Sequence, residues 1–137
     1  MLTFAAALLV FTLDVASKRA VRVLPARSYR VMRGLRITRV EFARQGFARR
    51  PGRAGLLLSW LFALACAAIL IRSGDAFQTV PAQLGVGAAL GGGFGNLLDV
   101  LRRHAITDFV DLGWWPVFNL ADAGIVCGLI AAFWPMV

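Results

Sequence analysis

Four long apolar runs within 137 residues constrain this chain more than any other feature. They cover residues 2–17, 54–71, 80–98 and 117–137. About 20 apolar residues cross the hydrocarbon core of a bilayer, so the last three runs are long enough and the first is marginal. Apolar residues make up 59% of the chain and charged residues 16%, whereas soluble domains have about 45–50% and about 25%. We therefore expect a single integral membrane domain, residues 1–137, that is all-α with four transmembrane helices.

The first of these runs also has the length of a signal peptide. It lacks the basic residues that precede the apolar part of a signal peptide, and no Ala-x-Ala cleavage site follows its apolar part before the basic residues begin at Lys18. We therefore expect it to be retained as a membrane span.

The basic residues are concentrated between the first two apolar runs. Of the 15 Lys and Arg residues, 12 lie between Lys18 and Arg53, and only Glu41 opposes them there. Because this segment joins two apolar runs, we expect its partners to be anionic lipid head groups and not nucleic acid. Polar and apolar side chains partly alternate over residues 36–42, which is typical of a strand. The sequence thus predicts a small basic interfacial segment, about residues 18–53, with a strand or hairpin in it.

Glycines recur at a spacing of four in the last two runs. Gly87, Gly91 and Gly95 lie in the third run, and Gly124 and Gly128 lie in the fourth. This spacing puts them on one face of a helix, where the missing side chains allow neighbouring backbones to approach closely. We expect tight helix packing and no nucleotide site, because neither GxGxxG nor a P-loop is present.

Carboxylates near the membrane are the clearest sign of chemistry in this sequence. An Asp at the centre of a span costs about 2.5–3.5 kcal/mol, so such residues usually face an interior and have a function. With four spans, the ends of the runs bring four aspartates to the same side of the membrane: Asp14, Asp99, Asp108 and Asp122. Two carboxylates that share one proton form an acid–base pair, in which one accepts a proton from water while the other polarises a carbonyl group.

Such a pair is the chemistry of aspartic proteases, and it needs no metal ion or cofactor. Other mechanisms fit the sequence less well, because the lone His104 cannot form an HExxH zinc site and no serine lies in a GxSxG motif. Neither Cys66 nor Cys127 has the spacing of metal ligands. Any single Asp could instead cap a helix or pair with Arg102 or Arg103.

Four stretches of the chain carry a family resemblance. They are residues 14–18 (DVASK), 95–99 (GNLLD), 107–109 (TDF) and 116–125 (PVFNLADAGI). In this order they resemble the motifs of the lipoprotein signal peptidase (signal peptidase II) family, and the resemblance covers nearly the whole chain. It implies a multi-pass aspartyl endopeptidase of the bacterial inner membrane. Such an enzyme cleaves diacylglyceryl-modified prolipoproteins just before the lipidated cysteine.

The resemblance also assigns roles to individual residues. It makes Asp108 and Asp122 the catalytic dyad, with no metal ion and no cofactor. The other matched positions are polar residues that line or support the family's site: Asp14, Lys18, Asn96, Asp99 and Asn119. The spacing of four between the first two agrees with a supporting ion pair, because it puts both on one side of a helix.

The chain departs from the family pattern where the family's substrate is held. The family usually has Arg directly after the third-span Asp, whereas here Val100 follows Asp99. Arg102 and Arg103 come three and four residues after Asp99, which is the spacing of neighbours on one helix face. We expect one of the two, with Arg103 preferred over Arg102, to pair with the Asp99 carboxylate. Residues 42–47 stand in place of an Asn-containing stretch and lack the Asn.

Charge and family resemblance predict opposite orientations. Short loops rich in Lys and Arg normally stay in the cytoplasm. The predicted spans leave 14 basic residues on the side of the aspartates, against Arg72 alone on the other side. That imbalance alone would place the site in the cytoplasm. The family has both termini in the cytoplasm and its site outside, and we expect this orientation because lipoproteins are cleaved on the outer face.

Two other functions are consistent with the same residues. A diverged relative that does not cleave would bind lipidated peptides or anionic lipid, and a small proton-coupled carrier would use the same acids. The carrier would show proton-dependent solute flux without cleavage, and the binder would show neither activity.

Overall fold

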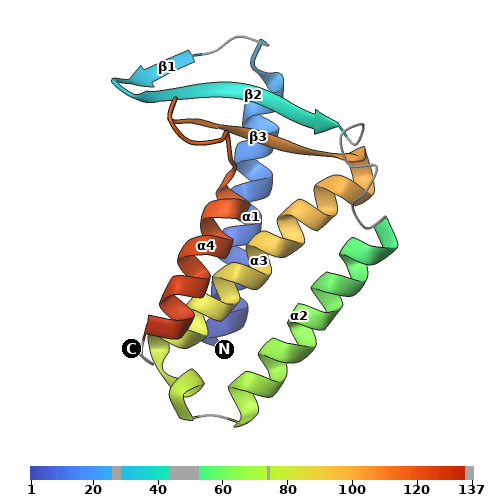
Figure 1. The fold of residues 1–137 in the computed structure, drawn as a ribbon, viewed down its shortest axis with the longest axis vertical. Helices are drawn as coiled ribbons and strands as arrows, with labels where there is room; N and C mark the ends of the chain where they lie inside the picture. The colour runs from blue at the N-terminus through green and yellow to red at the C-terminus, as the bar shows by residue number, and fades with distance from the viewer. Residues whose placement is uncertain (26–28, 44–52, 74, 135–137) are drawn as a thin grey trace.

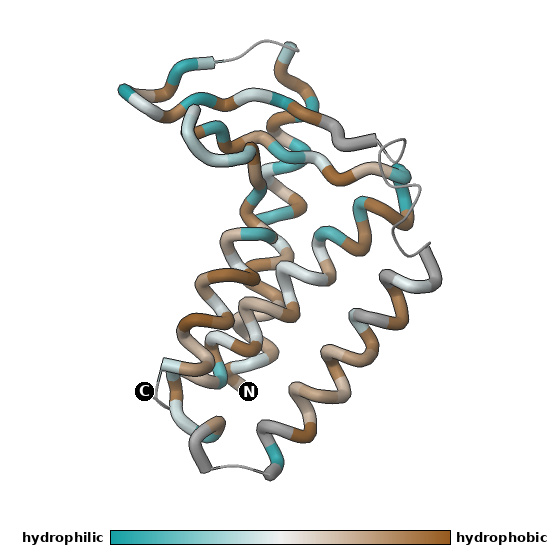
Figure 2. The backbone as a smooth tube through the Cα atoms, viewed as in Figure 1, coloured by the Kyte–Doolittle hydropathy of each residue, from teal (hydrophilic) through white to brown (hydrophobic). Residues whose placement is uncertain are grey.

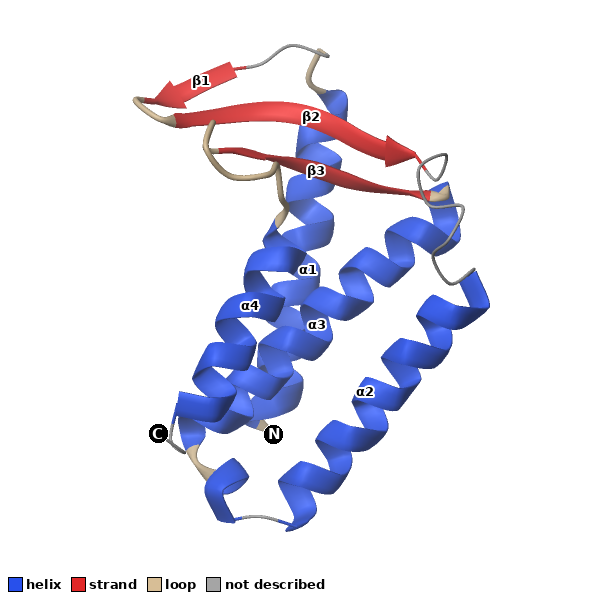
Figure 3. Cartoon of the chain, viewed as in Figure 1, coloured by secondary structure: helices blue, strands red, loops and turns tan. Residues whose placement is uncertain are grey.

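The computed structural model describes residues 1–25, 29–43, 53–73 and 75–134. Within them the chain forms helices that make up a bundle and a three-stranded sheet at one end of it (Figures 1 and 3). The helices are α1 (Leu2–Val23), α2 (Arg53–Ser73), α3 (Val80–Arg103) and α4 (Leu120–Phe133), with a short 3₁₀ helix, η2 (Asp75–Gln78). The strands are β1 (Tyr29–Met32), β2 (Leu35–Ala43) and β3 (Ala105–Asp111).

The glycines of α3 and α4 form the packing surfaces of the bundle, in which α3 contacts both α1 and α4 (Figure 1). A Cβ atom at Gly87 or Gly91 would collide with backbone carbonyl oxygens of α1, those of Thr3 and Ala7. On the other side of α3, α4 approaches closely enough that a Cβ at Gly128 would lie 2.6 Å from the Gly85 carbonyl oxygen. The predicted tight helix packing is therefore confirmed.

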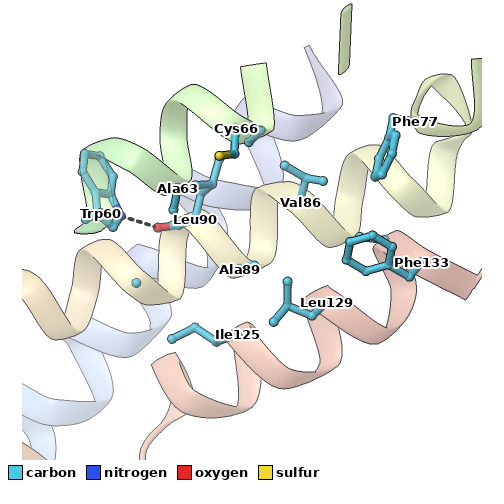
Figure 4. Close-up of a pocket in the computed structure, with 13 residues that line it drawn as sticks. Trp60, Ala63, Cys66, Phe77, Val86, Ala89, Leu90, Ile125, Leu129 and Phe133 are labelled. Carbon is cyan, nitrogen blue, oxygen red and sulfur yellow. Dashed lines mark hydrogen bonds between the residues drawn. The ribbon is translucent and has the colours of Figure 1, made fainter. Parts of the chain in front are cut away.

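Helix α2 stands apart from the other three (Figure 1), and one of its contacts with α3 is made by an aromatic side chain. The indole Nε1 of Trp60 donates to the Leu90 carbonyl oxygen over 3.3 Å, and its ring lies 5.0 Å from that of Phe94. Beside Trp60, a cavity of about 360 Å³ separates α2 from α3 and α4, and its lining is apolar (Figure 4).

The polar residues of the chain gather at the sheet end, and the bundle below it is largely apolar (Figure 2). By length and composition, α3 is the one described helix long and apolar enough to cross a membrane. Shorter apolar helical stretches cover Trp60–Ile69 and Leu120–Phe133. Helix α1 continues to Val23, six residues beyond the predicted end of the first run. The expectation of four helices is confirmed.

The sheet corrects the all-α prediction. Strands β1 and β2 lie in the basic segment, where a hairpin was expected, but β3 follows α3 directly and was not predicted. The strands are antiparallel in the order β1-β2-β3, and β3 pairs with β2 with Val40 opposite Asp108 and Arg36 opposite Asp111. Of the departing stretch 42–47, residues 44–47 lie outside the described part of the chain.

A backbone bridge connects the sheet to α4. Val110 and Phe118 form an antiparallel pair, with hydrogen bonds of 2.8 Å and 3.1 Å between their backbones. The bridge folds the loop after β3 back on the strand. It thereby brings Asn119, the residue directly before α4, beside Asp108 in the middle of β3.

Candidate active site

A buried ion pair on α1 forms the floor of the site. Asp14 and Lys18 are almost completely buried, and the ammonium group lies 2.7 Å from Asp14 Oδ2. Asp14 Oδ1 accepts the backbone N–H of Ala121 in the first turn of α4 over 3.0 Å. The carboxylate fits against α3 because residue 95 is Gly. A Cβ atom at this position would lie 2.5 Å from Asp14 Oδ2. The predicted spacing of four residues therefore does produce an ion pair, and the pair joins α1 to α3 and α4.

Lys18 extends this network to two polar residues of α3. Its Nζ donates to Asn96 Oδ1 over 2.9 Å and lies 3.4 Å from Asp99 Oδ2. One buried ammonium group therefore faces two carboxylates and an amide oxygen. Burying a charged group is costly unless it is paired and hydrogen-bonded. The two carboxylates compensate the charge of Lys18, and the Asn96 oxygen accepts a hydrogen bond from it.

Asp99 is held by Arg22 of α1, and the expectation that Arg103 holds it was wrong. Arg22 Nη2 lies 2.5 Å from Asp99 Oδ1, whereas Arg103 is exposed at the end of α3. The physical reason is the length of α1. The helix continues past Lys18 for another turn, and the further spacing of four residues puts Arg22 on the same face as Lys18.

Asn119 caps α4 and fixes Asp122 in its first turn. The Asn119 Oδ1 atom accepts the backbone N–H of Asp122 over 2.9 Å, and the Asp122 carboxylate accepts the backbone N–H of Asn119 over 3.2 Å. This reciprocal pair is a capping box. Asn96 Nδ2 donates to the other oxygen of Asp122 over 2.8 Å. A negative charge is favoured at this position, because the N-terminus of a helix carries a partial positive charge.

Asp108 faces the same asparagine from the sheet. The Nδ2 atom of Asn119 donates to Asp108 Oδ1 over 2.6 Å and to Asn96 Oδ1 over 3.0 Å. Burial, and to a smaller extent the negative charge of nearby Asp122, raise the pKa of the Asp108 carboxyl to about 6. A carboxyl group with this pKa keeps a proton more readily than a free aspartate does.

The structure thus brings seven of the eight predicted site residues into one hydrogen-bonded network from α1, α3, β3 and α4: Asp14, Lys18, Asn96, Asp99, Asp108, Asn119 and Asp122. Sequence reasoning missed Arg22 and Thr107. The spacing of four in Asp14, Lys18 and Arg22 was a signal for the first of these. Thr107 gave no signal, because its role depends on the pairing of β3. Among the described residues, no group of three or more His, Cys, Asp or Glu is placed to hold a metal ion.

Comparison with known proteins places this network in a family. A family model described as "Signal peptidase (SPase) II" matches residues 6–137. The chain belongs to the signal peptidase II family. It is 40% identical over 128 residues to a lipoprotein signal peptidase of Syntrophomonas wolfei, covering 88% of this chain and 83% of that protein. A lipoprotein signal peptidase of Rhodococcus jostii is 42% identical over 95 residues, which span 60% of this chain and about half (48%) of that protein.

Two solved structures have the same fold. Both are described as bacterial membrane enzymes, and both are 20% identical in sequence to this signal peptidase II family member. The TM-scores are 0.80 and 0.83, each over 98% of this chain, with 86% and 92% of the solved chains covered. The family model and the Syntrophomonas wolfei relative confirm the resemblance noted in the sequence, and the chain is an aspartic peptidase of the lipoprotein signal peptidase type.

One departure from the family motif is compensated within the chain. Val100 stands where the signal peptidase II motif usually has Arg, directly after Asp99. Asp99 nevertheless has two cationic partners, and both come from α1: Arg22 and Lys18.

Proposed function

We propose that this protein removes the signal peptide from diacylglyceryl-modified prolipoproteins by activating water between Asp108 and Asp122. The observation that carries the proposal is the position of Asn119. Its side chain donates to Asp108 and caps the helix turn that carries Asp122, so one buried residue orients both carboxylates. Membership of the signal peptidase II family supports the prolipoprotein as substrate.

The two carboxylates have different roles in this proposal. Asp108, with its raised pKa, holds the shared proton and donates it in a hydrogen bond to the scissile carbonyl oxygen. Asp122 lies in the first turn of α4 and accepts an N–H from Asn96, so its carboxylate is held facing the site, and in this proposal it is the proton acceptor. It accepts a proton as water attacks the carbonyl carbon. It then gives that proton to the leaving amine, and the C–N bond breaks.

The remaining polar residues act as supports for this dyad. Asn96 and Asn119 orient the carboxylates by direct hydrogen bonds. Asp99 forms ion pairs with Lys18 and Arg22. Asp14 and Lys18 hold α1, α3 and α4 together beneath them. In this proposal the reaction uses no metal ion and no cofactor, so a chelator leaves the rate unchanged.

The four helices form a single membrane domain, residues 1–137, in this proposal, with the sheet at the interface. The site lies where the bundle meets the sheet, and we place it at the outer face of the inner membrane. Three exposed arginines lie on β1, in the turn after it and on β2: Arg30, Arg33 and Arg36. Two exposed tryptophans, Trp114 and Trp115, lie in the loop after β3. Arginines and tryptophans together suit a surface of anionic lipid head groups.

Incubation of the purified protein with a diacylated prolipoprotein tests the function. We expect release of the signal peptide, with the same rate in the presence of a chelator. Binding of the lipidated substrate without cleavage would support a diverged relative that only binds. Inhibition by the chelator that added metal reverses would contradict the mechanism without metal.

The raised pKa of Asp108 predicts the pH dependence of cleavage. The dyad holds its shared proton below about pH 6 and loses it as the pH rises, because the pKa of Asp108 is about 6. We therefore expect kcat/KM to fall about tenfold per pH unit on the alkaline side once the proton is lost. The measurement is kcat/KM against pH in detergent micelles. An increase of kcat/KM through this range would contradict the role of Asp108 as the protonated partner.

Labelling of an introduced cysteine tests the orientation. In a variant with Cys66 and Cys127 replaced by Ala, Arg30→Cys on β1 should react with a membrane-impermeant thiol reagent once the outer barrier is permeable. Arg72→Cys is the matched control, since Arg72 is exposed at the end of α2 far from the sheet (Figure 1). It should react only after the inner membrane is broken. The reverse pattern would show that the charge of the loops decides the orientation.

A further inference from the structure

The guanidinium group of Arg22 connects three elements beside the dyad. Its Nη2 atom lies 2.5 Å from Asp99 Oδ1 on α3 and 2.8 Å from Thr107 Oγ1 on β3, and its Nε atom lies 3.1 Å from the same Thr107 oxygen. Asp99 Oδ2 in turn accepts the backbone N–H of Thr107 over 3.2 Å. Arg22, Asp99 and Thr107 therefore form a closed ring of hydrogen bonds, which we call the Arg22 clamp.

The clamp holds the residue directly before the proposed catalytic Asp108. Thr107 is 1% exposed, and both its backbone N–H and its hydroxyl are bound within the ring. Because successive residues of a strand share one rigid backbone, fixing Thr107 fixes the point from which the Asp108 side chain starts. Asp99 accepts the N–H of Thr107, and the planar fork of Arg22 donates two hydrogen bonds to the hydroxyl oxygen.

The rest of Arg22 is held as firmly as its guanidinium group. Its side chain is 13% exposed, and its backbone carbonyl oxygen accepts Arg39 Nη1 of β2 over 3.1 Å. The carbonyl lies in the last turn of α1, where helix carbonyls lack partners within the helix. The end of α1 that carries the clamp is therefore itself hydrogen-bonded to β2.

We propose that Arg22 is a positioning residue, which holds β3 against α3 and so keeps Asp108 within reach of Asp122. In the part of the chain that the structure describes, it forms no hydrogen bond or ion pair with either carboxylate of the dyad, and it acts through Thr107. The inference rests on the proposed function for its kinetic readout, since Asp108 is the group that it positions.

The first test separates kcat from KM. Arg22→Ala is expected to lower kcat by about 10- to 100-fold, since a misplacement of about 1 Å costs about 10² in rate. KM should change less than threefold. Arg22→Lys keeps a cation for Asp99 but loses the fork, so its kcat should lie between those of the wild type and Arg22→Ala. Arg19→Ala is the matched control, because Arg19 is an exposed arginine of the same helix. A wild-type kcat in Arg22→Ala would overturn the proposal.

A double-mutant cycle tests whether Arg22 acts through Thr107. Thr107→Val removes the hydroxyl, keeps the β-branched shape and leaves the ion pair between Arg22 and Asp99 in place. Alone it should lower kcat several-fold, and in the Arg22→Ala background it should add almost nothing. Additive losses would overturn the proposal. If Arg22→Ala does not fold, the same cycle run with Arg22→Lys decides the question.

Backbone hydrogen exchange gives a readout that does not depend on cleavage. In Arg22→Ala, residues 105–111 should exchange at least tenfold faster than in the wild type, while α4 keeps its protection. Unchanged exchange in β3 would overturn the clamp. A wild type that fails to cleave would instead contradict the proposed function, and exchange in β3 would still test the clamp. Arg19→Ala should exchange like the wild type throughout.

Discussion

Replacement of Asp108 or Asp122 with asparagine is expected to lower kcat by about 10²- to 10⁴-fold, which is the range for loss of a general acid or base. An asparagine amide has nearly the same shape as the carboxyl group but cannot take up and release the proton. Because the two groups act as one unit, the double variant should be little worse than either single variant. The measurement is the rate of signal-peptide release under single-turnover conditions.

Asp111→Asn is the matched control for this prediction. Asp111 lies at the end of the same strand, is half-buried and accepts hydrogen bonds from Thr38 and from the backbone N–H of Gly113. It has no contact with the dyad in the described part of the chain, so its replacement should leave kcat within about twofold. Near-normal cleavage by either dyad variant, in protein that is folded and inserted, would refute the assignment.

Replacement of Lys18 with methionine is expected to destabilise the protein by about 3–5 kcal/mol, which is the usual effect of removing one partner of a buried ion pair. The loss is large because Lys18 serves Asp14, Asn96 and Asp99 at once. Asp14 would then be a buried carboxylate with a single backbone donor, that of Ala121. The measurement is the free energy of unfolding of the purified protein in mixed micelles.

A second substitution shows whether the uncompensated charge is the cause. Asp14→Asn in the Lys18→Met background removes the buried negative charge and keeps an oxygen for the Ala121 N–H. This double variant should be more stable than Lys18→Met alone, since replacing both members of a buried pair costs less than removing one. Arg19→Met, an exposed neighbour, should lie within about 0.5 kcal/mol of the wild type. A Lys18→Met variant that is equally stable would contradict the structural role of the pair.

Local patterns in the sequence were sufficient for the helices and for much of the site. The apolar runs predicted the four helices, and the glycines spaced by four predicted which helix faces pack together. Asp14 and Lys18 could be paired in advance because a spacing of four residues is a contact within one helix. Asn119 and Asp122 likewise interact over three residues, and the capping box that they form depends on no distant element.

The strand β3 could not be predicted in this way. Its residues 105–111 form a strand because β2, which ends more than 60 residues earlier in the chain, offers them a partner. The end of the first helix was misjudged for a related reason. Charged side chains such as Lys18 and Arg22 normally end an apolar helix, but here the Asp99 carboxylate on α3 pairs with both of them, and the helix continues.

The sequence by itself determined the helices, their packing faces and the identity of the acids and amides that carry the proposed chemistry. All of these depend on contacts within a few residues or on motifs of a few residues. Only the tertiary structure decided which cation serves Asp99 and where Asp108 stands. Arg103 was expected because it lies four residues after Asp99 on the same helix, whereas the pairing with Arg22 depends on how the end of α1 packs in the fold. The spacing of four residues within α1 puts Arg22 on the face of Lys18, but only the packing of α1 on α3 makes Asp99 its partner.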